Sequence, residues 1–162
     1  MSKVVYKFGD DVSTDIIYPG RYMATVLPTE TPQFAFVDIT ELNAKLKSGE
    51  FEKGCIMVGG KNFGCGSSRE QAASAMKGFE IAIIARNFSR IFLQNGINLG
   101  LNMITCPEID AEEGDEIEFT ADKVINKTKG KEFPIVPLPK ARQAIIDAGG
   151  LIEYTRKMIM SN

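Results

Sequence analysis

Residues 55–77 read Cys55-Ile-Met-Val-Gly-Gly-Lys-Asn-Phe-Gly-Cys-Gly-Ser-Ser-Arg-Glu-Gln-Ala-Ala-Ser-Ala-Met-Lys77. The apolar run from Cys55 to Val58 predicts a buried strand. Apolar residues recur at helical spacing between Arg69 and Lys77, which predicts a helix. The segment between them contains four glycines. Residues 55–77 are therefore typical of a strand, a glycine loop and a helix in succession, the repeating unit of α/β folds.

The same pattern continues on both sides of this segment. Residues 80–85 predict a second buried strand and residues 89–95 a second helix. Lys3 to Phe8 alternates polar and apolar residues as a strand does, and Thr40 to Lys47 has the spacing of a short amphipathic helix. Between these two lies Ser13 to Phe36, which prolines and a glycine break into a long loop. Long loops in compact domains are often functional.

The C-terminal part of the chain has a different pattern. Short alternating runs separated by turn residues predict three antiparallel strands, at residues 116–119, 123–126 and 132–136. Two helices are expected after them, at residues 140–148 and 151–157. We therefore predict a single α/β domain over residues 1–162, with a mixed sheet or barrel and flanking helices.

Composition limits the possible partners. The chain has 162 residues, of which 44% are hydrophobic, and its formal net charge is -2. Because basic residues are interleaved with acidic ones, we expect neither a nucleic acid nor an anionic membrane as a partner. No apolar stretch approaches the ~18 residues of a membrane span, and the N-terminus lacks the apolar core of a signal peptide. We therefore expect a cytoplasmic protein.

The chain contains no histidine, which excludes every catalytic arrangement that needs an imidazole from this chain. Ser-His and Cys-His nucleophile pairs, zincin helices and imidazole proton shuttles cannot form within it. The three cysteines, Cys55, Cys65 and Cys106, include no C-x-x-C pair. They do not have the spacing of a zinc site or of iron-sulfur ligands, so we expect this chain to bind no metal.

The glycine loop does not fit the nucleotide-binding patterns. Asn62 follows Gly60-Lys61, where a phosphate-binding P-loop requires Ser or Thr. Arg69 stands where the pattern G-x-G-x-x-G needs its third glycine, which lets the helix pack closely on the strand. Two interpretations of the loop remain open, one structural and one chemical.

In the structural interpretation, Ser67 is the N-cap of the following helix and Glu70 completes a capping box. In the chemical interpretation, the helix N-terminus binds an anion, and Arg69 adds a planar guanidinium suited to a carboxylate. A cation at this position opposes the helix dipole, and an anionic ligand would compensate it. Ser67 or Ser68 would then lie beside the bound acid. Without histidine, a serine alkoxide would need N–H groups, Arg69 or an external cation to stabilise it.

Three segments, in order along the chain, carry a resemblance to a known family. They are Phe8-Gly-Asp-Asp-Val-Ser-Thr-Asp-Ile-Ile17, Asn62-Phe-Gly-Cys-Gly-Ser-Ser-Arg-Glu70 and Arg86-Asn-Phe-Ser-Arg-Ile-Phe92. Over nearly its whole length, the chain resembles the small subunits of 3-isopropylmalate dehydratases. That subunit corresponds to the C-terminal domain of aconitase, so the resemblance implies a β/β/α swivelling domain.

The resemblance also implies an activity. Such a hydro-lyase moves a hydroxyl between neighbouring carbons of a malate-type acid by dehydration and rehydration. In that family the first serine of G-S-S-R-E is the base that takes the carbon-bound proton, which is Ser67 here. The second serine and the arginine, Ser68 and Arg69, hold a substrate carboxylate. The family's 4Fe-4S cluster lies on a large subunit, so a heterodimer or heterotetramer with that iron-sulfur subunit is implied.

The substrate-selecting loop of the family and its edge correspond to Arg21, Tyr22, Met23, Ala24 and Thr25. Homoaconitase-type members carry an extra arginine in this loop, as in Y-L-R-T, which meets a third carboxylate. Met23 and Ala24 instead offer apolar contact without charge. The resemblance therefore favours an alkyl malate such as isopropylmalate, and with it leucine biosynthesis. A 2,3-dimethylmalate dehydratase is an alternative, and homoaconitase is disfavoured.

Two further points remain open. Asp15 matches the acidic residue of the family's S-T-D segment near the active site, and a turn cap explains it equally well. Arg86 and Arg90 are expected at the surface. Outside enzymes, the alternatives are a non-catalytic carboxylate-binding module and a structural subunit in which Ser67 only caps the helix.

Overall fold

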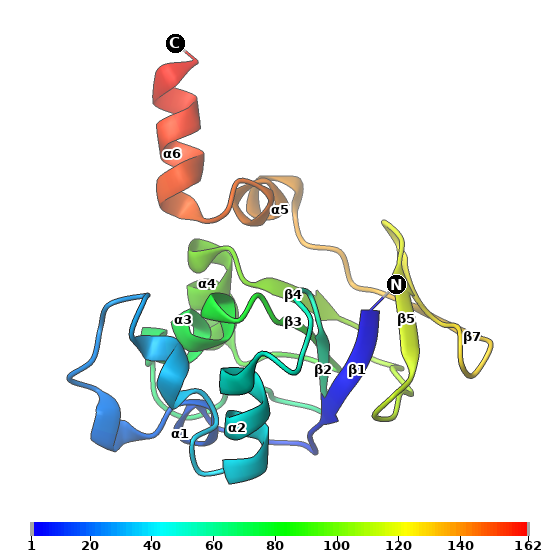
Figure 1. Ribbon diagram of the computed structural model, residues 1–162. Coiled ribbons are helices and arrows are strands. Elements are labelled where there is room, and N and C mark those ends of the chain that lie inside the picture. Colours follow the sequence, from blue (N-terminus) through cyan, green and yellow to red (C-terminus); the bar gives the residue numbers. More distant parts are fainter. Residues whose placement is uncertain (1, 162) are drawn as a thin grey trace.

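Seven strands form a mixed sheet in the structure, a computed structural model that describes residues 2–161 (Figure 1). In chain order they are β1 (Ser2–Lys7), β2 (Ile56–Gly59), β3 (Ala82–Ala85), β4 (Asn102–Thr105), β5 (Glu116–Phe119), β6 (Lys123–Asn126) and β7 (Lys131–Pro134). Their order across the sheet is β4-β3-β2-β1-β5-β6-β7. Neighbours among β1 to β4 are parallel, whereas β5 pairs antiparallel with β1 and β5 to β7 form an antiparallel extension.

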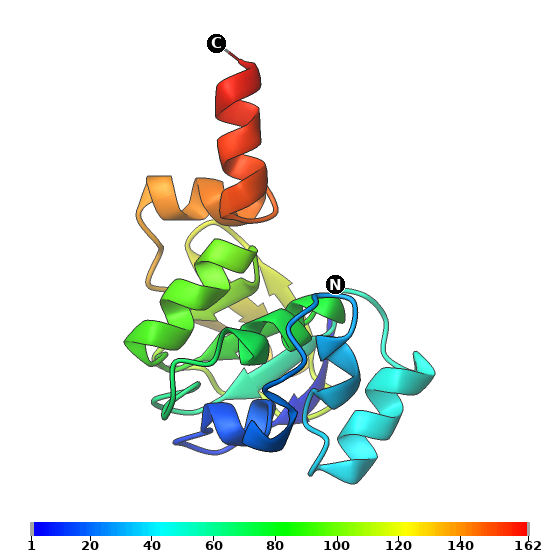
Figure 2. The same cartoon turned by 90° about the vertical axis from the view of Figure 1, so that its left-hand side faces the viewer.

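Helices pack on this sheet and extend from it. They are α1 (Thr14–Ile17), α2 (Thr40–Ser48), α3 (Glu70–Gly78), α4 (Arg90–Leu99), α5 (Lys140–Asp147) and α6 (Leu151–Met160), with 3-10 turns at Gly20–Tyr22 and Thr31–Phe34. Helices α3 and α4 lie side by side over one face of the parallel strands, while α6 points away from the body (Figure 2). No helix within residues 2–161 is long and apolar enough to cross a membrane.

The parallel strands are buried on both faces, which explains their continuously apolar sequence. Along β2 and β3, Met57 and Ile83 are paired in register and belong to the core under the helices. Their neighbours Ile56 and Ile84 belong to a second core on the opposite face. Side chains from β5 to β7 fill this second core as well. The antiparallel extension therefore curls over the face that the helices leave free.

The curl brings the two ends of the sheet together. β4 and β7 are the edge strands. Just beyond β7, the Val136 N–H donates to the Thr105 carbonyl at the end of β4 (2.8 Å), so an isolated antiparallel bridge joins the two edges. The sheet is therefore a half-barrel whose two edges are joined at this one bridge.

The predicted α/β fold, with a mixed sheet and flanking helices, is confirmed. The predicted helices and strands are present, with ends shifted by a few residues. The strand expected at residues 132–136 ends at Pro134, because Val136 has already turned towards β4. β4 itself was not predicted: its four residues mix polar and apolar types, and it is a strand because its backbone pairs in register with β3.

The packing predicts a specific cost of adding a methyl group to Gly64. This residue has a φ of +79°, and a Cβ there would lie 2.2 Å from Cγ of Phe92. Gly114 has a φ of +90° with nothing within 4 Å of an added Cβ, so Gly114→Ala is the matched control. We expect Gly114→Ala to lower the free energy of unfolding by about 1–2 kcal/mol through backbone strain. Gly64→Ala should lose a further ~1–3 kcal/mol through overpacking.

Urea unfolding followed by circular dichroism measures both losses. Equal losses in the two variants would show that Phe92 does not constrain this turn.

Candidate functional site

Backbone hydrogen bonds fix the glycine loop against the segment that follows β1. The Gly64 N–H donates to the Val12 carbonyl (2.7 Å), and the Thr14 N–H donates to the Cys65 carbonyl (2.8 Å). On the other side, the Ser89 hydroxyl at the start of α4 donates to the Gly64 carbonyl (2.6 Å). Three distant parts of the chain therefore meet at the loop, and the segment around Thr14 lies beside the start of α3.

The Ser67 hydroxyl is exposed, and a buried threonine holds it. Oγ of Ser67 lies 3.2 Å from Oγ1 of Thr14, which also donates to the Ser67 carbonyl (3.2 Å). Thr14 is 2% exposed, so its hydroxyl has a fixed position. Within residues 2–161, no titratable side chain bonds to the Ser67 hydroxyl. Ser67 can therefore accept a proton only if its alkoxide is stabilised electrostatically.

Arg69 is held by one edge of its guanidinium and leaves the other edge open. Its Nη1 donates to the carboxylate of Asp15 and to the Tyr18 carbonyl (3.1 Å). Asp15 also accepts from the Gly20 N–H (2.9 Å). The described residues provide no hydrogen-bond partner for Nη2 of Arg69, and a Cβ at Gly20 would lie 3.0 Å from that atom. A side chain at Gly20 would therefore crowd Nη2 of Arg69, and glycine leaves this atom uncovered on that side.

The Arg69–Asp15 pair also sets the charge of the site. The hydrogen bond from Arg69, followed by that from the Gly20 N–H, holds the pKa of Asp15 below its ordinary value. Asp15 therefore stays ionised and compensates the cation at the start of α3. The sequence predicts that an anionic ligand compensates the charge of Arg69. In the structure, Asp15 of the same chain already does so.

The predicted capping box is wrong. α3 begins at Glu70, and the N-cap position belongs to Arg69, which makes no side-chain capping bond. Ser67 lies too early to cap the helix, because its hydroxyl and its carbonyl are both within hydrogen-bond distance of the Thr14 hydroxyl. The first turn of α3 therefore keeps N–H groups that no side chain caps.

The predicted substrate loop is anchored from below. The buried Tyr18 hydroxyl donates to the carbonyls of Tyr22 (3.1 Å) and Thr25 (3.4 Å). Gln71, in the first turn of α3, donates to the Met23 carbonyl (3.3 Å). Sequence reasoning missed Tyr18 and Gln71, because neither the motif nor the spacing marks them. These bonds hold the loop backbone beside the helix that begins after Arg69.

Three other predicted site residues, Met23, Ala24 and Ser68, are exposed. Met23 is 43% exposed and Ala24 is exposed, so their apolar side chains are free for contact. Ser68 is exposed, and its carbonyl accepts from Asn95 of α4 (3.2 Å). The hydroxyls of Ser67 and Ser68 therefore stay accessible on the same turn of chain.

Arg21 is engaged elsewhere. Its guanidinium forms a two-point ion pair with Asp38 and lies 4.8 Å from the ring centroid of Tyr22. The bond from Arg21 holds the pKa of Asp38 below its ordinary value. The structure thus brings together Thr14, Asp15, Ser67 and Arg69, and it directs Arg21 to a separate partner.

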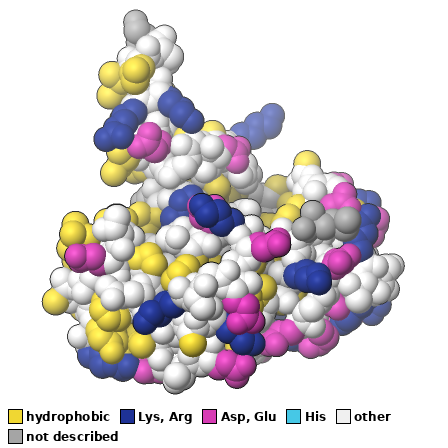
Figure 3. All heavy atoms as spheres, in the orientation of Figure 1, with side chains coloured by type: hydrophobic (Ala, Val, Ile, Leu, Met, Phe, Trp, Pro, Cys, Tyr) yellow, Lys and Arg dark blue, Asp and Glu magenta, His cyan; other side chains and the backbone are white. Residues whose placement is uncertain are grey.

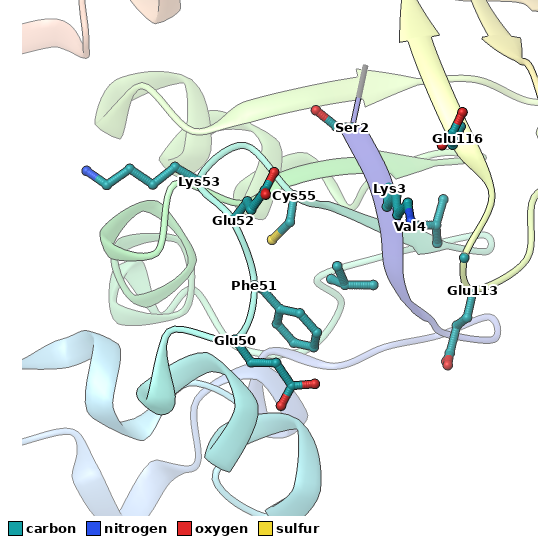
Figure 4. Close-up of a pocket in the computed structure, with 12 residues that line it drawn as sticks. Ser2, Lys3, Val4, Glu50, Phe51, Glu52, Lys53, Cys55, Glu113 and Glu116 are labelled. Carbon is teal, nitrogen blue, oxygen red and sulfur yellow. The ribbon is translucent and has the colours of Figure 1, made fainter.

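A cavity of about 630 Å³ lies at the start of β1, away from this cluster (Figure 4). Glu50, Phe51, Lys53 and Cys55 are among its lining residues, and none of the predicted site residues is. Burial raises the pKa of the Cys55 thiol to about 11, so it stays protonated and is a poor nucleophile. The candidate site is therefore the open surface around Ser67. Within the described part of the chain, no three His, Cys, Asp or Glu side chains gather as a metal site.

The part of the chain that matches known proteins includes all residues of the candidate site. Residues 12–108 match the family model described as Aconitase C-terminal domain. The chain is 44% identical over 157 residues to the 3-isopropylmalate dehydratase small subunit 1 of Archaeoglobus fulgidus, covering 94% of this chain and 95% of that protein. It is 42% identical over 158 residues to the 3-isopropylmalate dehydratase small subunit of Methanosarcina mazei, covering 95% of each.

A solved structure shares the fold. The crystal structure of a 3-isopropylmalate dehydratase from Methanocaldococcus jannaschii matches with a TM-score of 0.85 and 38% identity, covering 98% of this chain and 96% of that one. The similarity therefore extends through the glycine loop, the segment around Thr14 and the predicted substrate loop.

The charge pairing at the site predicts a reciprocal pair of titrations. In Arg69→Met, the pKa of Asp15 should rise towards its ordinary value of about 3.9, because Arg69 is the main cause of its lowering. In Arg21→Met, the pKa of Asp38 should rise instead and that of Asp15 should change little. Carbon-detected NMR titration of the carboxyl groups measures both.

The Arg69–Asp15 pair also determines how the free energy of unfolding changes with pH. Because the folded-state pKa of Asp15 is depressed, its stabilising contribution is present above its unfolded pKa and is lost as the pH falls through the folded pKa. If the pKa of Asp15 were the same in Arg69→Met as in the unmodified chain, the Arg69–Asp15 ion pair would be contradicted.

Proposed function

The chain belongs to the family of 3-isopropylmalate dehydratase small subunits, which share the aconitase C-terminal domain, and we propose that it supplies the proton-transfer half of such an active site. The observation that carries this proposal is the exposed Ser67 hydroxyl. It is positioned by Thr14 and lies two residues from a guanidinium with one open edge. The rest of the chemistry is assigned to a large subunit.

Arg69 binds and orients the acid. The open edge of its guanidinium donates hydrogen bonds to a substrate carboxylate, while Asp15 and the Tyr18 carbonyl hold the opposite edge in place. Two parallel hydrogen bonds to a carboxylate fix its plane as well as its position. Ser68 adds an exposed hydroxyl on the same turn. The substrate carbon next to the bound carboxylate is thereby held near Ser67.

Ser67 moves the proton. As its alkoxide, it removes the carbon-bound proton, the electron pair of that C–H bond forms the alkene, and hydroxide leaves the neighbouring carbon. Hydroxide then adds to the carbon that lost the proton, and Ser67 returns its proton to the other carbon, which completes the isomerisation and regenerates the alkoxide. The uncapped N–H groups in the first turn of α3 stabilise the alkoxide, and Thr14 fixes its position.

The described residues do not fit an iron-sulfur cluster. Cys55 and Cys106 are buried, and no group of potential ligands surrounds any cysteine. We assign the 4Fe-4S cluster to the large subunit, where it would supply Lewis-acid chemistry for the departing hydroxide. The active site then lies between the two chains, in a cytoplasmic heterodimer or heterotetramer, and the swivelling of this single domain closes it over the substrate.

The anchored loop favours an alkyl malate. Met23 and Ala24 present apolar side chains without a charge, and Arg21 is held by Asp38. We therefore propose isomerisation of 2-isopropylmalate to 3-isopropylmalate, a step of leucine biosynthesis. Dehydration of 2,3-dimethylmalate is the second candidate, because a smaller alkyl group fits the same apolar surface. A homoaconitase substrate would leave its third carboxylate without a cationic partner in this loop.

The proton-transfer proposal predicts the kinetics of the reconstituted pair of chains. Ser67→Ala should lower kcat by about 10²–10⁴-fold, the usual loss on removing a general base. Arg69→Lys should mainly raise KM, since a lysine cannot make the two-point contact. Ser48→Ala, an exposed serine at the end of α2, is the matched control and should keep normal turnover.

Normal kinetics in both Ser67→Ala and Arg69→Lys would defeat the site assignment, and turnover by this chain alone would defeat the assignment of chemistry to a partner. Calorimetry separates the enzyme subunit from a non-catalytic module. Tight binding of a dicarboxylate without the large subunit would favour the module.

The loop proposal predicts a change of substrate preference. Met23→Arg should raise the ratio of kcat/KM for homocitrate to that for isopropylmalate by at least about tenfold, since a charge-assisted hydrogen bond contributes ~1.5–3 kcal/mol. Val26→Arg, at a position that is 65% exposed, adds the same charge outside the predicted contact and should leave the ratio unchanged. An unchanged ratio in Met23→Arg would remove this loop from substrate selection. Parallel assays of isopropylmalate, homocitrate and dimethylmalate measure all three preferences.

A further inference from the structure

Helix α6 extends from the body and exposes apolar side chains along its length (Figure 3). No residue of Leu151–Met160 is buried. Ile152 is 69% exposed, Met158 52% and Ile159 71%. The helix contacts α4 and α5 near its first turn. Contiguous exposed apolar surface is typical of an interaction site.

The apolar residues form a stripe that is symmetric about Thr155. Leu151 and Ile159 lie four residues before and after it, and Ile152 and Met158 lie three residues before and after it. With 3.6 residues per turn, these five residues fall within an arc of about 120° centred on Thr155. The stripe therefore reads as apolar, apolar, threonine, apolar, apolar in either direction.

Such a pattern is complementary to itself when a second copy runs antiparallel. A two-fold axis beside Thr155 places Leu151 of one copy opposite Ile159 of the other, and Ile152 opposite Met158. Both copies use the same surface, as two-fold symmetry requires. Each α6 points away from its own body, so its apolar stripe is free along the helix (Figure 1).

No polar group opposes burial of the stripe. The Thr155 hydroxyl donates to the Leu151 carbonyl (2.8 Å), so it already has a partner within the helix. The charged side chains Glu153, Arg156 and Lys157 lie outside the arc, and Glu153 and Arg156 pair with each other (2.8 Å). These charges can stay in water while the stripe is covered.

We propose that α6 pairs antiparallel with α6 of a second copy, so that this chain forms a reversible homodimer. A ten-residue helix is only about 15 Å long, and the pair alone covers less than the ~800 Å² per partner of a stable complex. A groove of about 500 Å³ between α5 and α6, lined by Tyr154 and Met158, borders the stripe and adds to the surface. Association therefore depends on concentration. None of the candidate site residues belongs to α6.

Sedimentation of the full chain over a range of concentrations tests the pairing. The unmodified chain should pass from monomer to dimer, and Ile159→Glu should raise the dimer dissociation constant at least about tenfold by burying a charge. Met160→Glu is the matched control. Met160 is 86% exposed on the opposite side of the same helix, and its substitution should leave the dimer intact. Circular dichroism checks that both variants fold.

Crosslinking tests the direction of the pair. Thr155→Cys lies at the axis and should crosslink to itself under mild oxidation, whereas Leu151→Cys should not, because its counterpart in the other copy is residue 159. Self-crosslinking of both variants would indicate a parallel pair and overturn the proposal. A monomer at all concentrations would also overturn it, and so would an Ile159→Glu effect confined to assembly with the large subunit. Native Cys55 and Cys106 are buried, and the unmodified chain gives the background from Cys65.

Discussion

The candidate site depends on the backbone contact between the glycine loop and the segment after β1. Gly64 donates to the Val12 carbonyl, and Thr14 donates to the Cys65 carbonyl. Together with the Thr14–Ser67 and Arg69–Asp15 hydrogen bonds, this contact fixes the two segments relative to each other. The loop can approach so closely because Gly64 has a left-handed conformation and packs against Phe92 without a side chain of its own. The packing of α4 on α3 and the position of the Ser67 hydroxyl are therefore set by the same turn.

Some residues of the site hold Ser67 and Arg69 in position, and others leave them accessible. Thr14 is buried and lies within hydrogen-bond distance of the Ser67 hydroxyl, while Ser67 itself is exposed. Asp15 and Tyr18 hold one edge of Arg69, and Gly20 leaves the other edge uncovered. The polar groups of the site are therefore held in position and remain accessible to a ligand and to a second protein surface that covers it. This arrangement agrees with a domain that contributes half of an active site and meets the other half on a partner.

The sequence was informative where structure is local. The apolar runs of β2 and β3 and the helical spacing after Arg69 were enough to predict the α/β frame. β4 and the closing bridge between Thr105 and Val136 could not be predicted, because they are consequences of pairing between distant segments. The site follows the same division. Ser67, Ser68 and Arg69 are adjacent in sequence and were found together, whereas Thr14 and Tyr18 act through hydrogen bonds across the fold. The capping-box prediction was wrong for the same reason, since a distant hydroxyl holds the serine that local rules assign to the helix.

The ion pair between Arg69 and Asp15 has a consequence for acid-base behaviour. The chain contains no histidine, and Asp15 remains ionised well below neutrality because its pKa is lowered. Between mildly acidic and mildly alkaline conditions, the charge of Asp15 beside Arg69 therefore stays constant. A titration step near neutrality in this site would therefore come neither from Asp15 nor from an imidazole of this chain, which makes the pair an internal reference for assigning other ionisations.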